Sequence, residues 1–459
     1  MKVATSTLVA SSFLVASASS ALAVPAPAPS TQKRQEAVVH VPLTKREVQK
    51  RSGSDLLEWA NAQKAHLQGK YHMNSASSSS SSSSQRKRQS GQSLINLQYD
   101  STWLATVSGG TPAQDYNVVL DTGSSDFWID SAYSPSSSSS FRNVSTAFDI
   151  QYGSGAVDGY QATDDFTLAG TTVQNLGFAV ATSVSSGLVD SNMDGIMGMG
   201  FQRLASSGDK PFWIAANADT FSFYLQRASF TSSNQLQYGG VFTLGGSNSS
   251  LYQGDINYNS VIEALYWMID LGGISAGGSS VSLNSLDRAA IDTGTTLIGG
   301  PDSVVQSIYA NIAGSQSQGN GYYSYPCSST INATMTFGNK QYTISDTDFS
   351  AGTLDSRGST CLGAFFGLGS TLQTDLQWIV GDAFLKNVYT VFTNADNNPR
   401  VGFASLANGL NSGTNSRTVS TSSSGSGSSS PASKSSSLSS TSLATLAIGA
   451  TAAIFASVL

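Results

Sequence analysis

Short apolar runs separated by Gly, Ser and Asn recur along most of the chain. Runs such as 116–120, 148–152 and 240–244 are rich in β-branched and aromatic residues, which is typical of strands bounded by turns. Helical spacing stands out at 302–313, where apolar residues at every fourth position form one stripe. The pattern therefore predicts a mainly β protein with a helix at 302–313.

Apolar segments also stand at both ends of the chain. Residues 1–23 combine an early lysine, a short apolar core and the sequence Ala-Leu-Ala, which predicts a cleaved secretory signal peptide. A Ser/Thr/Gly-rich stretch at 408–442 predicts an O-glycosylated stalk, and the uncharged apolar residues 443–459 follow it. This arrangement predicts a glycolipid (GPI) anchor signal, the alternative being a short membrane helix. We expect a secreted chain held extracellularly at the plasma membrane or cell wall.

Residues 24–88 differ from the rest of the chain in composition and charge. They contain three dibasic pairs, a serine tract and a basic cluster that ends at Arg88. Residues 1–88 hold 12 basic and 4 acidic residues, a net charge of +8, whereas the remainder holds 11 and 25, a net charge of −14. A basic segment would bind an acidic body near neutral pH and leave as aspartates protonate. We expect a pro-segment cut after Arg88; the alternative is a disordered basic arm.

The tripeptide Asp-Thr-Gly occurs twice, at 121–123 and 292–294, each time after an apolar run. A hydroxyl residue follows each glycine, and an apolar-apolar-Gly element lies downstream of each motif. This repetition indicates a diverged internal duplication. Carboxylates on two matching loops, Asp121 and Asp292, can share one proton and act as an acid–base pair. The alternative is that each motif is only a turn whose hydroxyl bonds the backbone.

Histidine and glutamate are nearly absent after the predicted cleavage point. All three histidines, His40, His66 and His72, precede Arg88, and Glu263 is the only glutamate after residue 58. Ser-His-Asp triads, Cys-His pairs and histidine zinc sites are therefore excluded from the mature protein. We expect no metal and no cofactor, and the acidic body argues against a nucleic-acid partner.

Cysteine and asparagine patterns fit an exported protein. Cys327 and Cys361 are the only cysteines, so we expect them to form a structural disulfide. Asn-x-Ser/Thr motifs at Asn143, Asn248 and Asn332 predict N-glycosylation sites on the surface.

The motifs occur in an order that resembles the pepsin-like aspartic endopeptidases across residues 89–407. The matching pieces are GTPAQDYNVVLDTGSSDFW, FDIQYGSG, MDGIMGMG, TFSFYL, AAIDTGTTL and WIVGDAFLKNVYTVF. The resemblance implies a bilobal β fold with pseudo-symmetric lobes at 89–255 and 256–407 and the active site in the cleft between them. It also implies a monomer that acts on proteins or peptides. Together with the stalk and anchor signal, the pro-segment resembles the yapsin-type surface proteases of fungi.

The resemblance further assigns roles to single residues. Asp121 and Asp292 would be the catalytic pair: one acts as general base on a water, and the other donates a hydrogen bond to the peptide carbonyl. The glycines would let the two loops approach, and the hydroxyls would orient the aspartates. The support residues expected around the pair are Gly123, Ser124, Gly294 and Thr295.

A turn sequence, Gly153-Ser154-Gly155, follows Tyr152 between two strand-like runs and predicts a hairpin. In the family this hairpin is the flap over the substrate, so the resemblance implies that Tyr152, Gly153 and Ser154 contact substrate. Trp128 would support the tyrosine ring. On its own, Tyr152 is equally compatible with a half-buried strand position.

Lys70-Tyr71 in the pro-segment resembles the pair that blocks the active site of related zymogens. The Lys70 ammonium would lie on the two aspartates until acid disrupts the contact, so the chain's own pro-segment would be an intramolecular inhibitor. The alternative is an exposed lysine in a linker. For the whole protein, the alternative to an acid endopeptidase is a catalytically silent surface scaffold or adhesion protein with the same fold.

Overall fold

The computed structural model describes residues 39–46, 53–71, 100, 102–152, 155–186, 188–189, 192–227, 236–369 and 375–410. The predicted signal peptide at 1–23, nearly all of the stalk at 408–442 and the tail at 443–459 lie outside these residues. Within the described residues, no helix is both long and apolar enough to cross a bilayer.

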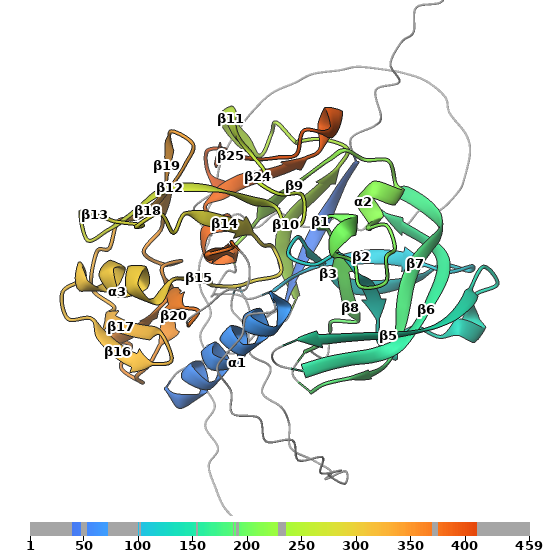
Figure 1. Cartoon of the computed structure of the whole chain (residues 1–459), viewed down its shortest axis with the longest axis horizontal. Helices are drawn as coiled ribbons and strands as arrows, with labels where there is room; N and C mark the ends of the chain where they lie inside the picture. The colour runs from blue at the N-terminus through green and yellow to red at the C-terminus, as the bar shows by residue number, and fades with distance from the viewer. Residues whose placement is uncertain are drawn as a thin grey trace, which may run out of the picture. The chain divides into compact units, whose positions relative to one another are not determined.

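The described chain is mainly β, as the sequence predicts, and its largest sheet has 13 strands (Figure 1). Their order is β11-β25-β24-β9-β10-β1-β2-β3-β8-β4-β7-β6-β5. The strands are β1 (Val39–Arg46), β2 (Trp103–Gly109), β3 (Gln114–Asp121), β4 (Phe127–Ile129), β5 (Arg142–Tyr152), β6 (Gly155–Leu168), β7 (Thr171–Val184), β8 (Gly195–Gly198), β9 (Thr220–Leu225), β10 (Leu236–Leu244), β11 (Tyr252–Ser260), β24 (Val388–Thr393) and β25 (Arg400–Leu406). Because β9 pairs with β24, this sheet takes strands from both predicted lobes.

The C-terminal half carries two further sheets. One has the order β19-β18-β12-β14-β23-β15-β22, with β13 paired to β12, and the other has the order β16-β17-β21-β20. The strands are β12 (Met268–Ala276), β13 (Ser279–Val281), β14 (Arg288–Ile291), β15 (Ile298–Gly300), β16 (Gln316–Gly319), β17 (Tyr322–Pro326), β18 (Ala333–Phe337), β19 (Lys340–Ile344), β20 (Ser350–Thr353), β21 (Thr360–Gly363), β22 (Phe365–Gly367) and β23 (Trp378–Val380).

Helices are few among the described residues. They are α1 (Ser54–Lys70), α2 (Phe212–Ala215), α3 (Asp302–Ala310) and α4 (Asp382–Leu385), with short 3-10 turns η1 (Pro135–Ser137), η2 (Gln202–Leu204) and η3 (Ala395–Asn397). The predicted helix at 302–313 is present as α3 but ends at Ala310. The chain turns away through Gly314, whose positive φ of 78° is a conformation that glycine adopts without strain.

The internal duplication suggested by the sequence has a structural counterpart. Strand β3, which leads into the first Asp-Thr-Gly motif, pairs in parallel with β8, and β14, which leads into the second, pairs in parallel with β23. Both β8 and β23 contain the downstream apolar-apolar elements of the repeat. In each half an antiparallel strand, β4 or β15, flanks this pair. The two motifs are therefore held by the same local arrangement.

Regular structure in the predicted pro-segment was not foreseen from the sequence. Strand β1 lies between β10 and β2 in the large sheet. Helix α1 buries one face, made by Leu56, Trp59, Ala60 and Leu67. Its backbone and side chains bond the C-terminal half: Tyr322 donates to the Ala60 carbonyl, and Gln68 Nε2 donates to the Leu368 carbonyl at 2.7 Å.

On its other side, α1 contacts β5 of the N-terminal half. In Figure 1 it runs between the strands coloured yellow to orange and those coloured green to teal. The helix therefore contacts both halves of the described chain.

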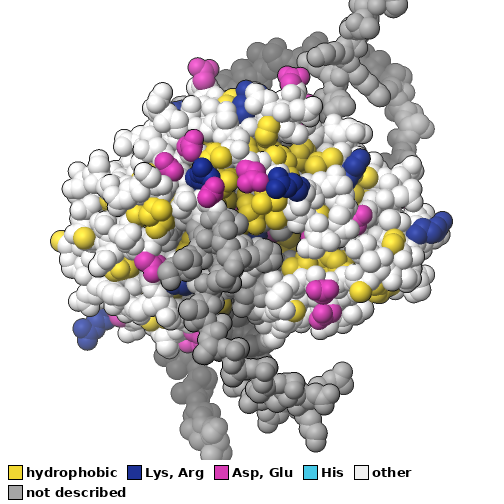
Figure 2. All heavy atoms as spheres, viewed as in Figure 1, with side chains coloured by type: hydrophobic (Ala, Val, Ile, Leu, Met, Phe, Trp, Pro, Cys, Tyr) yellow, Lys and Arg dark blue, Asp and Glu magenta, His cyan; other side chains and the backbone are white. Residues whose placement is uncertain are grey.

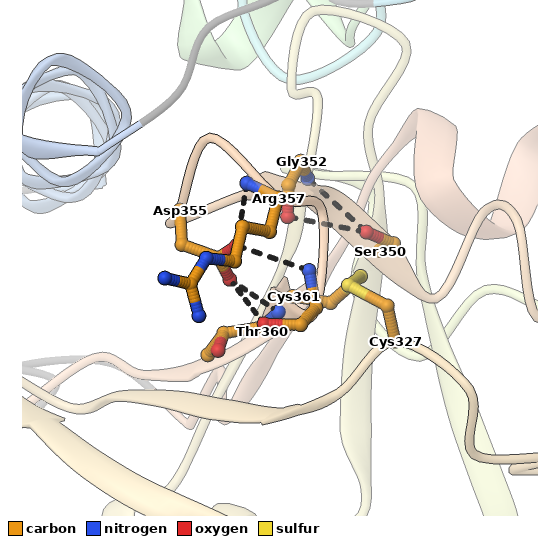
Figure 3. The surroundings of a disulfide bond; sticks show 8 residues. Cys327, Ser350, Gly352, Asp355, Arg357, Thr360 and Cys361 are labelled. Atoms are coloured by element: carbon orange, nitrogen blue, oxygen red, sulfur yellow. Dashed lines mark hydrogen bonds between the residues drawn. A yellow bond between two sulfur atoms is a disulfide. The ribbon is translucent and has the colours of Figure 1, made fainter.

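A disulfide joins Cys327 to Cys361, 34 residues apart (Figure 3). Within its loop, the Asp355 carboxylate accepts hydrogen bonds from the backbone N–H groups of Arg357, Ser359 and Thr360. These backbone hydrogen bonds hold the pKa of Asp355 well below its usual range. The loop also receives the start of α1, because the Gly53 N–H donates to the Thr353 carbonyl at 3.3 Å.

Replacing both Cys327 and Cys361 with serine should lower the free energy of unfolding of the full chain by about 3–4 kcal/mol, the loop-closure value for a loop of this length. Urea unfolding followed by tryptophan fluorescence measures the change. Wild type unfolded in reductant should match the double variant. A double variant that unfolds within 1 kcal/mol of oxidised wild type would contradict a stabilising role for the bond.

Candidate active site

The two Asp-Thr-Gly aspartates meet in the interior of the described chain. Asp121 is the last residue of β3 and Asp292 directly follows β14, so each projects from the end of a strand that is held by its parallel partner. Both are buried, with exposed fractions of 2% and 0%. Burial of two carboxylates side by side is unfavourable unless each is hydrogen bonded and their charge is compensated.

The threonines of the two motifs lock the loops together through reciprocal hydrogen bonds. Thr122 Oγ1 donates to the Ile291 carbonyl at 2.8 Å, and Thr293 Oγ1 donates to the Leu120 carbonyl at 2.6 Å. Each backbone N–H in turn donates to the other threonine's hydroxyl oxygen, at 3.1 and 3.0 Å. Four bonds thus fix the distance between the two aspartate loops.

The glycines of the motifs make the close approach possible. A Cβ on Gly294 would lie 2.3 Å from Asp121 Oδ1, and a Cβ on Gly123 would lie 2.6 Å from the Asp292 carboxyl carbon. Both distances are shorter than nonbonded atoms tolerate. Any larger residue at either position would push the opposite carboxylate away.

Each aspartate is oriented by its own loop. Ser124 Oγ donates to Asp121 Oδ2 and Thr295 Oγ1 donates to Asp292 Oδ2, both at 2.5 Å. The second oxygen of each carboxylate accepts the backbone N–H of Gly123 or Gly294, both at 2.9 Å. The two halves therefore present their carboxylates in matching ways, with the four support residues expected from the sequence in contact with them.

Lys70, the last residue of α1, reaches both carboxylates. Its ammonium lies 2.7 Å from Asp121 Oδ1 and 2.8 Å from Asp292 Oδ2. The neighbouring Tyr71 hydroxyl donates to Asp292 Oδ2 at 3.0 Å, and its ring lies 4.9 Å from that of Tyr266. Lys70 also sits at the C-terminal end of its helix, where a cation interacts favourably with the helix dipole.

The environment separates the pKa values of the pair. Burial raises the pKa of Asp121, and the adjacent Asp292 raises it further, although Lys70 opposes both. Burial also tends to raise the pKa of Asp292, but the charge and hydrogen bonds of Lys70, Asp121 and Thr295 hold it well below its usual range. Burial tends to lower the pKa of Lys70, yet the two carboxylates raise it. Lys70 is therefore a charged group between the two carboxyls.

Charged side chains are sparse on one face of the described chain. On the face shown in Figure 2, Lys and Arg side chains stand apart from one another and are interspersed with Asp and Glu on a mostly uncharged surface. Among the described residues, no cluster of three His, Cys, Asp or Glu side chains has the arrangement of a metal site.

Other residues singled out from the sequence lie away from the pair or outside the described residues. Trp128 is buried in β4. The backbone of Tyr152 pairs with Gly155 in a β5–β6 hairpin, but the Tyr152 side chain, Gly153 and Ser154 lie outside the described residues. Among the asparagines of the glycosylation motifs, Asn143 and Asn332 are exposed and Asn248 is half-buried.

Three features of the site were not found from the sequence. The first is the set of reciprocal hydrogen bonds between Thr122 and Thr293. The sequence clue to it was that both motifs have threonine as their middle residue. The second is His66, which lies one helical turn before Lys70 and lines the same part of the cleft. The third is Asp382 of α4, whose burial raises its pKa well above the usual range.

Comparison with known proteins gives a consistent result. A family model described as eukaryotic aspartyl protease matches residues 102–406. Major aspartyl peptidase 1 of Cryptococcus neoformans var. grubii is 40% identical over 356 residues, which cover 70% of this chain and 72% of that protein. An aspartic protease of Phaffia rhodozyma is 34% identical, covering 83% and 94%. Pepsin A of Sus scrofa is 32% identical, covering 69% and 84%.

Replacing Thr122 with valine should lower the free energy of unfolding by about 1–3 kcal/mol, because the Ile291 carbonyl and the Thr293 N–H lose a buried partner. Urea unfolding of the full chain measures this. Thr122→Ser is the matched control, since it keeps the hydroxyl, and it should unfold closer to wild type. Equal stability of the valine variant and wild type would show that the reciprocal bonds do not hold the loops.

Proposed function

We propose a mechanism and a means of control for peptide hydrolysis by this chain, which belongs to the eukaryotic aspartyl protease family. It is an aspartic-type endopeptidase with that family's mainly β, bilobal fold. Asp121 and Asp292 are the catalytic pair, and the chain is made as a zymogen whose α1 blocks them. The observation that carries the proposal is that one ammonium, that of Lys70, bonds both buried carboxylates.

The proposed chemistry follows from the properties of the pair. With α1 gone, a water between the carboxylates takes the position of the ammonium. One ionised carboxylate removes a proton from this water as it attacks the peptide carbonyl carbon, and the protonated carboxyl donates to the carbonyl oxygen. The carboxyl that took the water's proton then gives it to the leaving nitrogen as the C–N bond breaks, and a hydroxyl proton of the tetrahedral intermediate returns to the other carboxylate, so the pair again holds one proton. The pair titrates as a unit because the two carboxyls are coupled.

Inhibition by the pro-segment is supported by what α1 does in the cleft. Lys70 and Tyr71 use the hydrogen-bonding capacity of the carboxylates that a water and a peptide would need. The apolar face of α1 is buried against the body, and the +8 charge of residues 1–88 opposes the −14 charge of the remainder. Residues 24–88 therefore act in the proposal as an intramolecular inhibitor that is cut off after Arg88.

The remaining parts of the proposal concern location and processing. Residues 1–23 direct export, lobes 89–255 and 256–407 form the enzyme, and 408–442 with 443–459 form a stalk and a GPI-anchor signal, as in yapsin-type surface proteases. The proposed enzyme is an extracellular monomer at the cell surface. Its flap is the hairpin of Tyr152, Gly153 and Ser154, supported by Trp128. Its N-glycans are on Asn143, Asn248 and Asn332.

Asp292→Asn should reduce kcat/KM for an unfolded protein substrate by about 10²–10⁴-fold in acid, because an amide neither accepts the water's proton nor shares one with Asp121. The variant is matured by an added protease that cuts after basic residues, so that loss of self-processing does not confuse the result. Asp255→Asn, at an exposed position, is the matched control and should keep wild-type activity. Activity of Asp292→Asn equal to that of the control would refute the proposed pair.

Lys70→Met should weaken the hold of the intact pro-segment by about 10²–10³-fold, since removal of one partner leaves buried carboxylates without their cation. The measurement is hydrolysis of a short peptide by the uncleaved chain at neutral pH, relative to the matured enzyme. Lys64→Met removes a lysine from the same helix whose ammonium donates to the Asn320 carbonyl instead, and should have a smaller effect. Equal latency of Lys70→Met and wild type would contradict inhibition through Lys70.

A further inference from the structure

A histidine lies beside the ion pairs that hold α1 in the cleft. His66 is one helical turn before Lys70, so both side chains project from the same face of α1. It lines a cavity of about 100 Å³ between the helix and the body. Apolar Val119, Leu188, Met193 and Ile196 line this cavity together with Asp121 and Thr293.

Two charged groups act on His66: Lys70, on its own helix, and Asp292, which follows β14. Asp121, at the end of β3, lines the same cavity. Burial against the apolar wall disfavours the imidazolium most, Lys70 adds repulsion, and Asp292 opposes both. Together they lower the pKa of His66 to about 4. His66 is therefore neutral while the helix is docked near neutral pH.

We propose that His66 is the acid trigger of this zymogen: protonation of its imidazole places a second cation one helical turn from Lys70, against an apolar wall, and drives α1 out of the cleft. The inference rests on the proposed function, in which α1 blocks the catalytic pair. It assigns a step of activation to a residue of the inhibitor, in addition to the catalytic aspartates.

The direction of the pKa shift of His66 and the pH range in which it titrates support this assignment. A histidine has an ordinary pKa of about 6.5, and docking lowers it, so its contribution to docking is complete above pH 6.5 and is lost as the pH falls toward 4. A difference of this size weakens docking roughly 300-fold, because each pKa unit is a factor of ten.

The aspartates also respond to acid. The docked Lys70 lowers the pKa of both Asp121 and Asp292, so a proton taken up by either carboxyl favours release of α1. Lys70 stays charged throughout, because its pKa is raised. His66 adds a group that titrates between pH 6.5 and 4 and whose protonation also favours release.

The test compares the uncleaved full chain with its matured form. Hydrolysis of a short peptide is measured at fixed pH values from 7 to 3 before any conversion, and each rate is divided by that of matured enzyme at the same pH. This ratio reports the open fraction and removes the pH dependence of catalysis itself. In wild type it should rise as the pH falls from 6.5 to 4, up to roughly 300-fold where it does not saturate.

His66→Gln keeps a polar side chain that takes up no proton in this range. Its open fraction should rise less steeply than that of wild type as the pH falls from 6.5 to 4, because only the carboxylates then respond to acid. His66→Lys carries a permanent charge and should be open at pH 7 to the extent that wild type is open at pH 4. Lys64→Met is the matched control: it loosens the helix by a similar factor at every pH without moving the profile.

Folding of the variants is checked by their products. Residue 66 is absent from the chain after cleavage at Arg88, so each variant should yield matured enzyme with wild-type specific activity. A His66→Gln profile that rises between pH 6.5 and 4 as in wild type would overturn the trigger, and so would a His66→Lys chain that stays closed at pH 7. A wild-type chain that is fully open at pH 7 would instead refute inhibition by α1.

Discussion

Two carboxylates buried side by side, Asp121 and Asp292, set the constraint on which the rest of the described structure depends. Like charges in a water-poor site repel each other, and each loses hydration that must be replaced. The chain meets this requirement twice by the same means: a strand delivers the aspartate, a backbone N–H and a hydroxyl bond it, and a glycine leaves room for the opposite carboxylate. The reciprocal threonine bonds then fix the spacing between the halves.

The same constraint explains how α1 contacts the site. A site with two close carboxylates is satisfied well by one buried cation that bonds both, and a lysine at the end of a helix brings such a cation on a rigid support. The helix is anchored away from the site through its apolar face and through bonds to Leu368 and Tyr322. Its hold is therefore divided between an apolar part that is insensitive to pH and a charged part that responds to it.

The sequence predicted the parts of this structure that depend on local patterns. The mainly β fold, the helix that begins at Asp302, the repeated motif and the contacts of Ser124 and Thr295 with the aspartates all follow from short stretches with recognisable chemistry. Strand β1 and helix α1 did not, because residues 24–88 are basic and polar. Their order comes from partners that are distant in sequence, β10 for the strand and residues 320–368 for the helix. The role of His66 also needed the structure, since a histidine in a basic segment has no distinctive signal until its neighbours are known.

The distribution of histidine along the chain gives the proposed activation a direction. All three histidines precede Arg88, so a chain cut there retains aspartates and tyrosines but loses every group with an ordinary pKa near 6.5. If His66 senses mild acid, the sensor is discarded in the step that it starts. A return to neutral pH then restores neither the docked helix nor the latent state.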